Sequence, residues 1–201
     1  RNLNYIAMNK ISDMPRPIEL RGKTALILGM GGIGSLLAEK LSAFGMKIIA
    51  VDQKIIPMNS FIDEFYYQND LDNVIINADV VISAIPSTSL SNKIFSANLF
   101  ERMKNGVIFI NISRGKIVNT DDLVKYLKKN KFLGIGLDVT DPEPLPISHE
   151  LRNDVRVIIT PHIAGPSDYN RQRAVEVLHK NLNSYILGDP LINIVNKKLG
   201  H

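Results

Sequence analysis

Three side chains suited to binding an anion and moving a proton follow three apolar runs of the sequence. Arg114 follows the run 107–112, Glu143 lies between two prolines after the run 132–139, and His162 follows the run 155–160. An arginine fork holds a carboxylate or carbonyl by paired hydrogen bonds. Histidine is a common proton donor near neutral pH, and a rigidly held carboxylate can orient it. Taken singly, each residue has a plainer interpretation: a rim arginine in an ion pair, an acidic surface loop and a structural histidine.

A glycine-rich turn earlier in the chain has the spacing G-x-G-x-x-G, at Gly29, Gly31 and Gly34. These glycines permit a tight turn, close approach of the backbone to a pyrophosphate, and close packing of helix on strand. Asp52 lies 18 residues past Gly34, where its carboxylate can accept hydrogen bonds from ribose hydroxyls. It would repel a 2′-phosphate, so NAD is favoured over NADP. Lys54 could contact a phosphate and keeps NADP as the alternative.

Together these residues match the requirements of hydride transfer between a nicotinamide and a ketone. A cation positions the substrate and polarises its carbonyl, and an acid protonates the oxygen as the hydride arrives. A carboxylate keeps that acid charged and oriented. The conjunction makes the plainer interpretations of Arg114, Glu143 and His162 much weaker than they are singly.

The elements that must position these groups alternate along the chain. Short apolar runs predict strands at 24–28, 47–51, 79–85, 107–112, 132–139 and 155–160, and a further short strand at the end of 61–67. Helical spacing of apolar residues predicts helices at 33–44, 71–77, 96–104, 120–129 and 168–187, the last with one apolar side. Residues 141–146 are proline-rich and irregular. We therefore predict a Rossmann-type doubly wound parallel sheet with helices on both faces, in which ligands bind beyond the carboxyl ends of the strands.

The composition is that of an ordinary globular protein of 201 residues, with 45% hydrophobic and 22% charged residues. The net charge of +4 comes without a long basic block, so no nucleic-acid partner is expected. Cysteine is absent, which excludes a disulfide framework and a thiol nucleophile. No run is long enough to span a membrane, no metal site is expected, and a cytoplasmic location is the default.

The motifs in their order resemble those of the D-isomer-specific 2-hydroxyacid dehydrogenases, which include phosphoglycerate, glycerate and D-lactate dehydrogenases. The resemblance runs from about residue 20 to about residue 196. The pieces that carry it are Gly29-Met-Gly-Gly-Ile-Gly34, Asp52, Ala84-Ile-Pro86, Asn111-Ile-Ser-Arg-Gly115, Gly136-Leu-Asp-Val139, Glu143-Pro-Leu-Pro146 and Thr160-Pro-His-Ile-Ala-Gly165.

The resemblance implies a role for each matching residue. Arg114 would bind a small 2-hydroxy or 2-oxo acid, His162 would be the acid–base, and Glu143 would orient it. Asp138 would bind the carboxamide side of the nicotinamide. The full set of implied cofactor contacts is Gly29, Gly31, Gly32, Ile33, Gly34, Asp52, Ile85, Pro86, Ile112, Ser113, Arg114, Asp138, His162, Ala164 and Gly165.

Family members carry an additional lobe before this region, and that lobe is mostly missing from the sequence. We therefore interpret residues 1–19 as a connecting segment and residues 20–188 as the NAD-binding domain. Residues 189–201 form a tail expected to return toward the missing lobe. The family's cofactor domain also makes a dimer interface, so the resemblance implies a homodimer. A small departure is Thr140, which stands where an aromatic residue is common.

Two other functions stay open from the sequence. One is a non-catalytic NAD(H)-sensing binding protein of the same fold, such as a corepressor, and the intact Arg114, Glu143 and His162 argue against it. The other is a different Rossmann enzyme, such as a formate dehydrogenase, which would need distinct substrate residues in the missing lobe.

Overall fold

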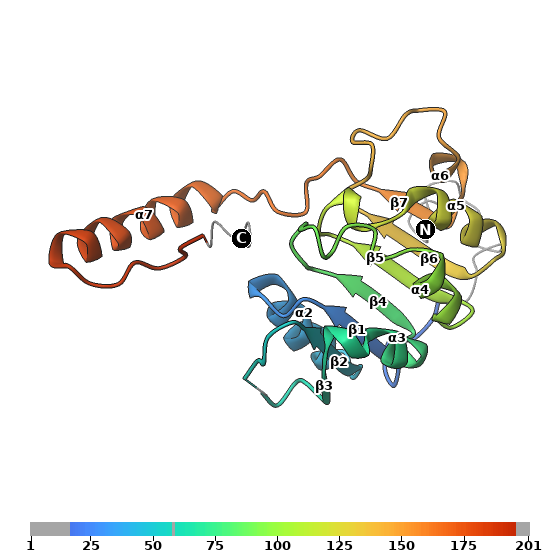
Figure 1. Cartoon of the computed structure of the whole chain (residues 1–201), viewed down its shortest axis with the longest axis horizontal. Helices are drawn as coiled ribbons and strands as arrows, with labels where there is room; N and C mark the ends of the chain where they lie inside the picture. The colour runs from blue at the N-terminus through green and yellow to red at the C-terminus, as the bar shows by residue number, and fades with distance from the viewer. Residues whose placement is uncertain (1–16, 58, 196–201) are drawn as a thin grey trace.

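The computed structural model describes residues 17–57 and 59–195, and these form a seven-stranded parallel sheet (Figure 1). The strand order is β3-β2-β1-β4-β5-β6-β7, so the chain reverses its direction of travel across the sheet between β1 and β4. The strands are β1 (Thr24–Leu28), β2 (Lys47–Asp52), β3 (Glu64–Tyr67), β4 (Val80–Ser83), β5 (Val107–Asn111), β6 (Phe132–Leu137) and β7 (Val157–Ile159). The predicted doubly wound sheet is confirmed.

The central strands are apolar along their whole length because the sheet is covered on both faces there. β1, β2 and β4 are almost completely buried, whereas the edge strands β3 and β7 are only partly buried. The expected strands are all present, and most are shorter by one to three residues than their apolar runs. The carboxyl ends of β1, β4, β5, β6 and β7 therefore lie along one edge of the sheet.

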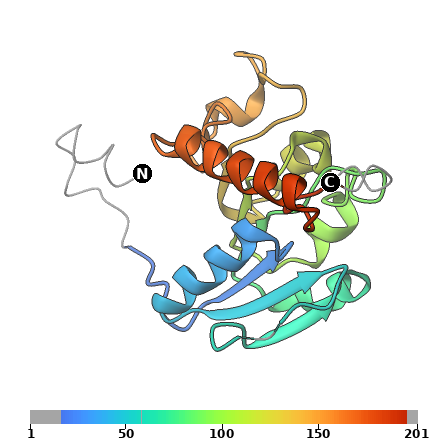
Figure 2. The ribbon, with the colours of Figure 1, turned by 90° about the vertical axis from the view of Figure 1, so that its left-hand side faces the viewer.

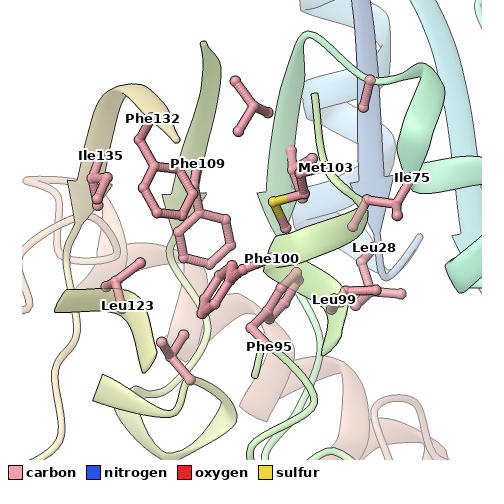
Figure 3. Close-up of a cluster of buried hydrophobic side chains, with 14 of the residues drawn as sticks. Leu28, Ile75, Phe95, Leu99, Phe100, Met103, Phe109, Leu123, Phe132 and Ile135 are labelled. Atoms are coloured by element: carbon pink, nitrogen blue, oxygen red, sulfur yellow. The ribbon is translucent and has the colours of Figure 1, made fainter. Parts of the chain in front are cut away.

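Helix α2 (Gly32–Ala43) covers one face of the sheet, and α3 (Leu71–Val74), α4 (Ala97–Arg102) and α5 (Thr120–Lys128) cover the other. Under α4 and α5, aromatic side chains form the centre of the larger core, with Phe100 in contact with Phe95, Phe109 and Phe132 (Figure 3). Asn119 begins α5 by accepting a hydrogen bond from the Asp122 amide at 3.3 Å. This core fixes the positions of β4, β5 and β6 relative to one another.

Of the two remaining α-helices in the described residues, the sequence predicted one and missed the other. A short helix, α6 (Glu150–Asn153), lies in a segment where the sequence predicted no helix, and the side chain of His149 accepts a hydrogen bond from the Leu151 amide at its start. Helix α7 (Asn170–Leu187) forms nearly as expected but projects away from the sheet (Figure 1). Figure 2, viewed from the side of α7, shows the helix in front of the rest of the domain. No residue of α7 is buried by the described chain, so its apolar side stays exposed.

The chain turns back after α7 through Gly188, whose φ of +73° is a left-handed helix end. The Asn181 side chain then pairs with the backbone N–H and C=O of Ile192 at 2.8 and 3.1 Å. The first residues of the expected tail thus run beside α7, and its destination stays a prediction. The expected connecting segment lies mostly outside the described residues. Among the described residues, no helix is long and apolar enough to cross a membrane.

Candidate active site

The glycine turn lies between the carboxyl ends of β1 and β4, where the order in which the chain adds strands to the sheet reverses. Gly29 has a φ of +96°, and a Cβ there would lie 2.7 Å from the carbonyl oxygen of Ala84, so only glycine fits. A Cβ at Gly34 would lie 1.9 Å from the carbonyl oxygen of Gly29, which holds α2 tightly against the turn. These two glycines serve close packing, as their spacing predicts.

The space above the start of α2 is open and suited to an anion. Apart from the adjacent backbone of the turn and of α2 itself, a Cβ at Gly31 or Gly32 would meet no atom within 4 Å. The first turn of α2 has no side-chain cap and no acidic residue, so its free N–H groups face this space. The residues present therefore fit the pyrophosphate of a dinucleotide.

Asp52 ends β2 and faces a cavity of about 340 Å³ beside the glycine turn. Its carboxylate accepts hydrogen bonds from the Met30 amide at 2.7 Å and from the Lys54 amide at 3.0 Å. A carboxylate has about four acceptor positions, so two remain for ribose hydroxyls. Ile85 and Pro86 line the same cavity and supply an apolar surface for a planar base.

The turn after β5 holds Arg114 through its own backbone and side chains. The Asn111 side chain accepts a hydrogen bond from the Ser113 amide and donates one to the Arg114 carbonyl, both at 3.0 Å. The Ser113 hydroxyl is buried against the Ser83 hydroxyl at 2.9 Å. Arg114 itself is exposed, and its Nη1 donates to the Ser113 carbonyl at 2.7 Å. The turn is rigid while most of the guanidinium N–H groups stay available.

His162 and Glu143 come from separate loops and meet at one contact. The Nδ1 atom of the imidazole lies 2.7 Å from Oε1 of the glutamate, and the two side chains are 45% and 41% exposed. The backbone of His162 has a φ of +54°, a left-handed conformation that is rare for a residue other than glycine. The contact at Nδ1 leaves Nε2 as the ring atom available to a ligand.

Supporting contacts fix the loop that carries Glu143. The Thr140 hydroxyl donates to the carbonyl of Pro142, and the Thr120 hydroxyl donates to the carbonyl of Asp141, both at 2.8 Å. Gly115 packs so closely that a Cβ there would lie 1.9 Å from the Thr140 carbonyl oxygen. The arginine turn and the glutamate loop are therefore in direct contact.

Asp138 directly follows β6, lies between the arginine turn and the segment that carries His162, and is 7% exposed. Its carboxylate accepts hydrogen bonds from the Thr160 hydroxyl at 2.6 Å and from the amides of Ile163 and Ala164 at 2.9 and 3.0 Å. Burial alone would raise the pKa of Asp138, but the hydrogen bonds from Thr160, Ala164 and Ile163 hold it below its usual value. The carboxyl is thus charged near neutral pH.

A cavity of about 720 Å³ brings seven of the predicted site residues together. They are Ile33, Ile112, Arg114, Asp138, His162, Ala164 and Gly165, and Pro166 lines the cavity with them. Glu143 lines a neighbouring cavity of about 490 Å³, which Asp138 and His162 also border. Ser113 is buried and lines neither cavity. Within the described residues, no group of three or more histidine, aspartate or glutamate side chains could hold a metal ion.

Sequence reasoning missed three supporting residues: Asn111, Gly115 and Thr160. All three lie inside the motifs quoted above, but their roles depend on contacts between loops that the sequence does not reveal. The arrangement can hold an anion with a guanidinium, present an imidazole proton to it, and place both beside a dinucleotide cradle.

Comparison with known proteins gives a family match over most of the chain. The family model described as "D-isomer specific 2-hydroxyacid dehydrogenase, NAD binding domain" matches residues 5–164. A glyoxylate reductase from Thermofilum pendens is 34% identical over 188 residues, which are 90% of this chain and 53% of that protein. The chain spans about half the length of the curated relatives that it matches.

Two solved structures show the same fold at moderate sequence identity. Phosphoglycerate dehydrogenase from Lactobacillus plantarum is 31% identical, with a TM-score of 0.75 over 96% of this chain and 63% of that one. The NADPH-dependent glyoxylate/hydroxypyruvate reductase from Sinorhizobium meliloti, in complex with NADP and sulfate, is 26% identical. Its TM-score is 0.87, over 100% of this chain and 63% of that one.

Proposed function

The chain belongs to the D-isomer-specific 2-hydroxyacid dehydrogenase family through its NAD-binding domain. We propose that it is the cofactor-binding domain of an oxidoreductase that interconverts a small D-2-hydroxy acid and its 2-oxo acid. The observation that carries the proposal is the contact between His162 and Glu143 at 2.7 Å, at the border of the cavity that Arg114 also lines. The relatives whose names specify glyoxylate and hydroxypyruvate support the substrate class.

Each of the three residues has a distinct role in the proposal. Nε2 of the His162 imidazolium donates a proton to the oxygen of the 2-oxo group during reduction and takes it back during oxidation. Glu143 holds Nδ1 of that ring and stabilises its positive charge. The guanidinium of Arg114 binds the substrate by paired hydrogen bonds. A bound nicotinamide dinucleotide supplies or accepts the hydride.

We assign the preferred dinucleotide as NAD, with NADP as the alternative. The carboxylate of Asp52 lies in the cavity beside the glycine turn, where it suits two ribose hydroxyls and repels a phosphate. Replacing Asp52 with serine should lower the ratio of the NADPH dissociation constant to the NADH dissociation constant, because the repulsion of the 2′-phosphate is removed. Fluorescence titration of both cofactors measures this ratio, and an unchanged ratio would refute the ribose assignment.

Exchanging His162 for alanine tests the proposed reaction. Turnover of glyoxylate, hydroxypyruvate, pyruvate and 3-phosphohydroxypyruvate, followed by NADH absorbance, should fall about 10²–10⁴-fold while NADH affinity stays nearly constant. His179 on α7 is the matched control, because it is exposed and lies outside every cavity described above. Equal loss of turnover and NADH affinity would contradict the acid–base role.

The same assay separates the enzyme from a non-catalytic NAD(H)-sensing protein. Tight binding of NADH without turnover of any of these acids would favour the binding protein. By analogy with the family we also propose a homodimer formed by this domain. Sedimentation velocity tests it, and a single monomeric species at micromolar concentration would contradict it.

A further inference from the structure

Four of the hydrogen bonds that fix the segment 160–164, which carries His162, are accepted by a single residue, Asp138. The carboxylate of Asp138 accepts from the hydroxyl of Thr160 and from the amides of Ile163 and Ala164. The backbone carbonyl of Asp138 accepts from the amide of His162 at 2.9 Å. Four of the segment's donors thus converge on one residue at the end of β6.

This convergence matters because the backbone of His162 is held away from its preferred conformation. A φ of +54° is unfavourable for a residue with a Cβ, and such conformations persist only where surrounding contacts enforce them. Here the enforcing contacts come on both sides of His162: Thr160 before it, and Ile163 and Ala164 after it. Releasing them would let the histidine return to a negative φ, which would turn its ring away from Glu143.

Asp138 is also connected to the turn that carries Arg114. Its amide donates to the carbonyl of Asn111 at 3.0 Å, and the Asn111 side chain in turn holds the backbone of Ser113 and Arg114. The segment of His162 and the turn of Arg114 are therefore both hydrogen-bonded to Asp138 at the end of β6.

We propose that Asp138 is a positioning residue, which holds segment 160–164 so that the His162 ring meets Glu143 and faces the cavity lined by Arg114. This inference rests on the proposed function for its effect on turnover. The four hydrogen bonds that Asp138 accepts from segment 160–164, called the clamp below, depend on the structure alone. The positioning role is an alternative to the role expected from the sequence, which was a contact to the nicotinamide carboxamide. At least three acceptor positions of the buried carboxylate already serve the protein.

The test is the variant Asp138→Asn, with Asp79→Asn as the matched control. The Asp79 side chain also accepts a hydrogen bond from a backbone amide, that of Thr24 at 2.9 Å. Asp79 precedes β4, however, and so lies at the amino ends of the strands, away from segment 160–164. Amide hydrogen exchange measured by NMR should be at least about 10-fold faster at Ile163 and Ala164 in Asp138→Asn. Exchange in the buried strand β1 should stay as in the wild type, and Asp79→Asn should leave Ile163 and Ala164 unchanged.

Kinetics supply the readout that a merely structural role would not move. In Asp138→Asn, kcat should fall about 10–100-fold, while KM and the dissociation constant for NADH change less than about threefold. A rise in that dissociation constant as large as the loss of kcat, with exchange unchanged, would overturn the proposal in favour of a direct cofactor contact.

The exchange measurement keeps the two proposals distinguishable. Unchanged exchange at Ile163 and Ala164 in Asp138→Asn would overturn the clamp even if the wild type has full dehydrogenase activity. Accelerated exchange in Asp138→Asn, with a wild type that turns over none of the acids, would support the clamp and contradict the proposed function. If Asp138→Asn does not fold, Thr160→Val removes one donor and leaves the carboxylate. It should accelerate exchange at the same two amides, and Thr160→Ser should restore the wild-type rates.

Discussion

Replacing Gly115 with alanine tests how tightly the arginine turn packs against the glutamate loop. The added carbon would lie 1.9 Å from the Thr140 oxygen and 2.6 Å from the Asp141 nitrogen, whereas ordinary contact begins at 3.4 Å. Both neighbours are backbone atoms, so a loop must move by about 1.5 Å. Overpacking costs about 1–3 kcal/mol, and we expect the upper end because no flexible side chain can yield.

A loss of about 3 kcal/mol corresponds to a decrease in Tm of about 6–12 °C for a domain of this size. Thermal unfolding followed by circular dichroism measures it. Gly134→Ala is the control, because the nearest atom to its added carbon is 3.8 Å away, in ordinary contact. Since the displaced loop carries Glu143, turnover in the Gly115 variant should also fall by at least about 10²-fold, because a misplacement of about 1 Å already has that effect. A Gly115 variant that melts with the wild type would refute this account of the packing.

Three further substitutions have expected outcomes. Asn119→Ala removes the cap of α5 and should cost about 1 kcal/mol in urea unfolding, with no loss if the cap is unimportant. Phe100→Ala leaves a cavity in the aromatic core and should cost about 3–5 kcal/mol by the same measurement, and a cost under about 1 kcal/mol would contradict it. Burial alone would raise the pKa of Asp79, but the Thr24 amide and Lys104 hold it below its usual value. Its stabilising contribution is therefore complete above about pH 4 and is lost as the pH falls through the lowered folded pKa. Lys104→Met should diminish this acid-dependent loss of unfolding free energy, and an identical pH dependence would refute it.

The sheet could be predicted because its strands are short apolar runs, each ended by polar or glycine residues. The run at 24–28, for example, coincides with β1, since both of its neighbours in the sheet are also buried strands. Once the parallel order is accepted, the side chains that follow β5, β6 and β7 must lie at one edge. For this reason the sequence alone indicates that Arg114 and His162 lie close together.

What the sequence could not reveal depends on contacts between loops distant along the chain. The left-handed backbone of His162 is uncommon for any residue with a Cβ, and contacts from distant residues enforce it, so no local pattern predicts it. The closeness of Gly115 to Thr140 is likewise invisible, because the two residues belong to different loops. Helix α7 shows the opposite limit: its apolar periodicity predicts the helix but not whether anything covers its apolar side.

The edge strand β7 has a consequence for how the molecule loses activity. It has only three residues, bonds to one neighbouring strand, and is the element from which the segment of His162 extends. Outer strands with few buried contacts detach at a lower free energy than the core. On warming, turnover should therefore be lost before most of the domain unfolds. The temperature of half-inactivation should lie below the Tm measured by calorimetry.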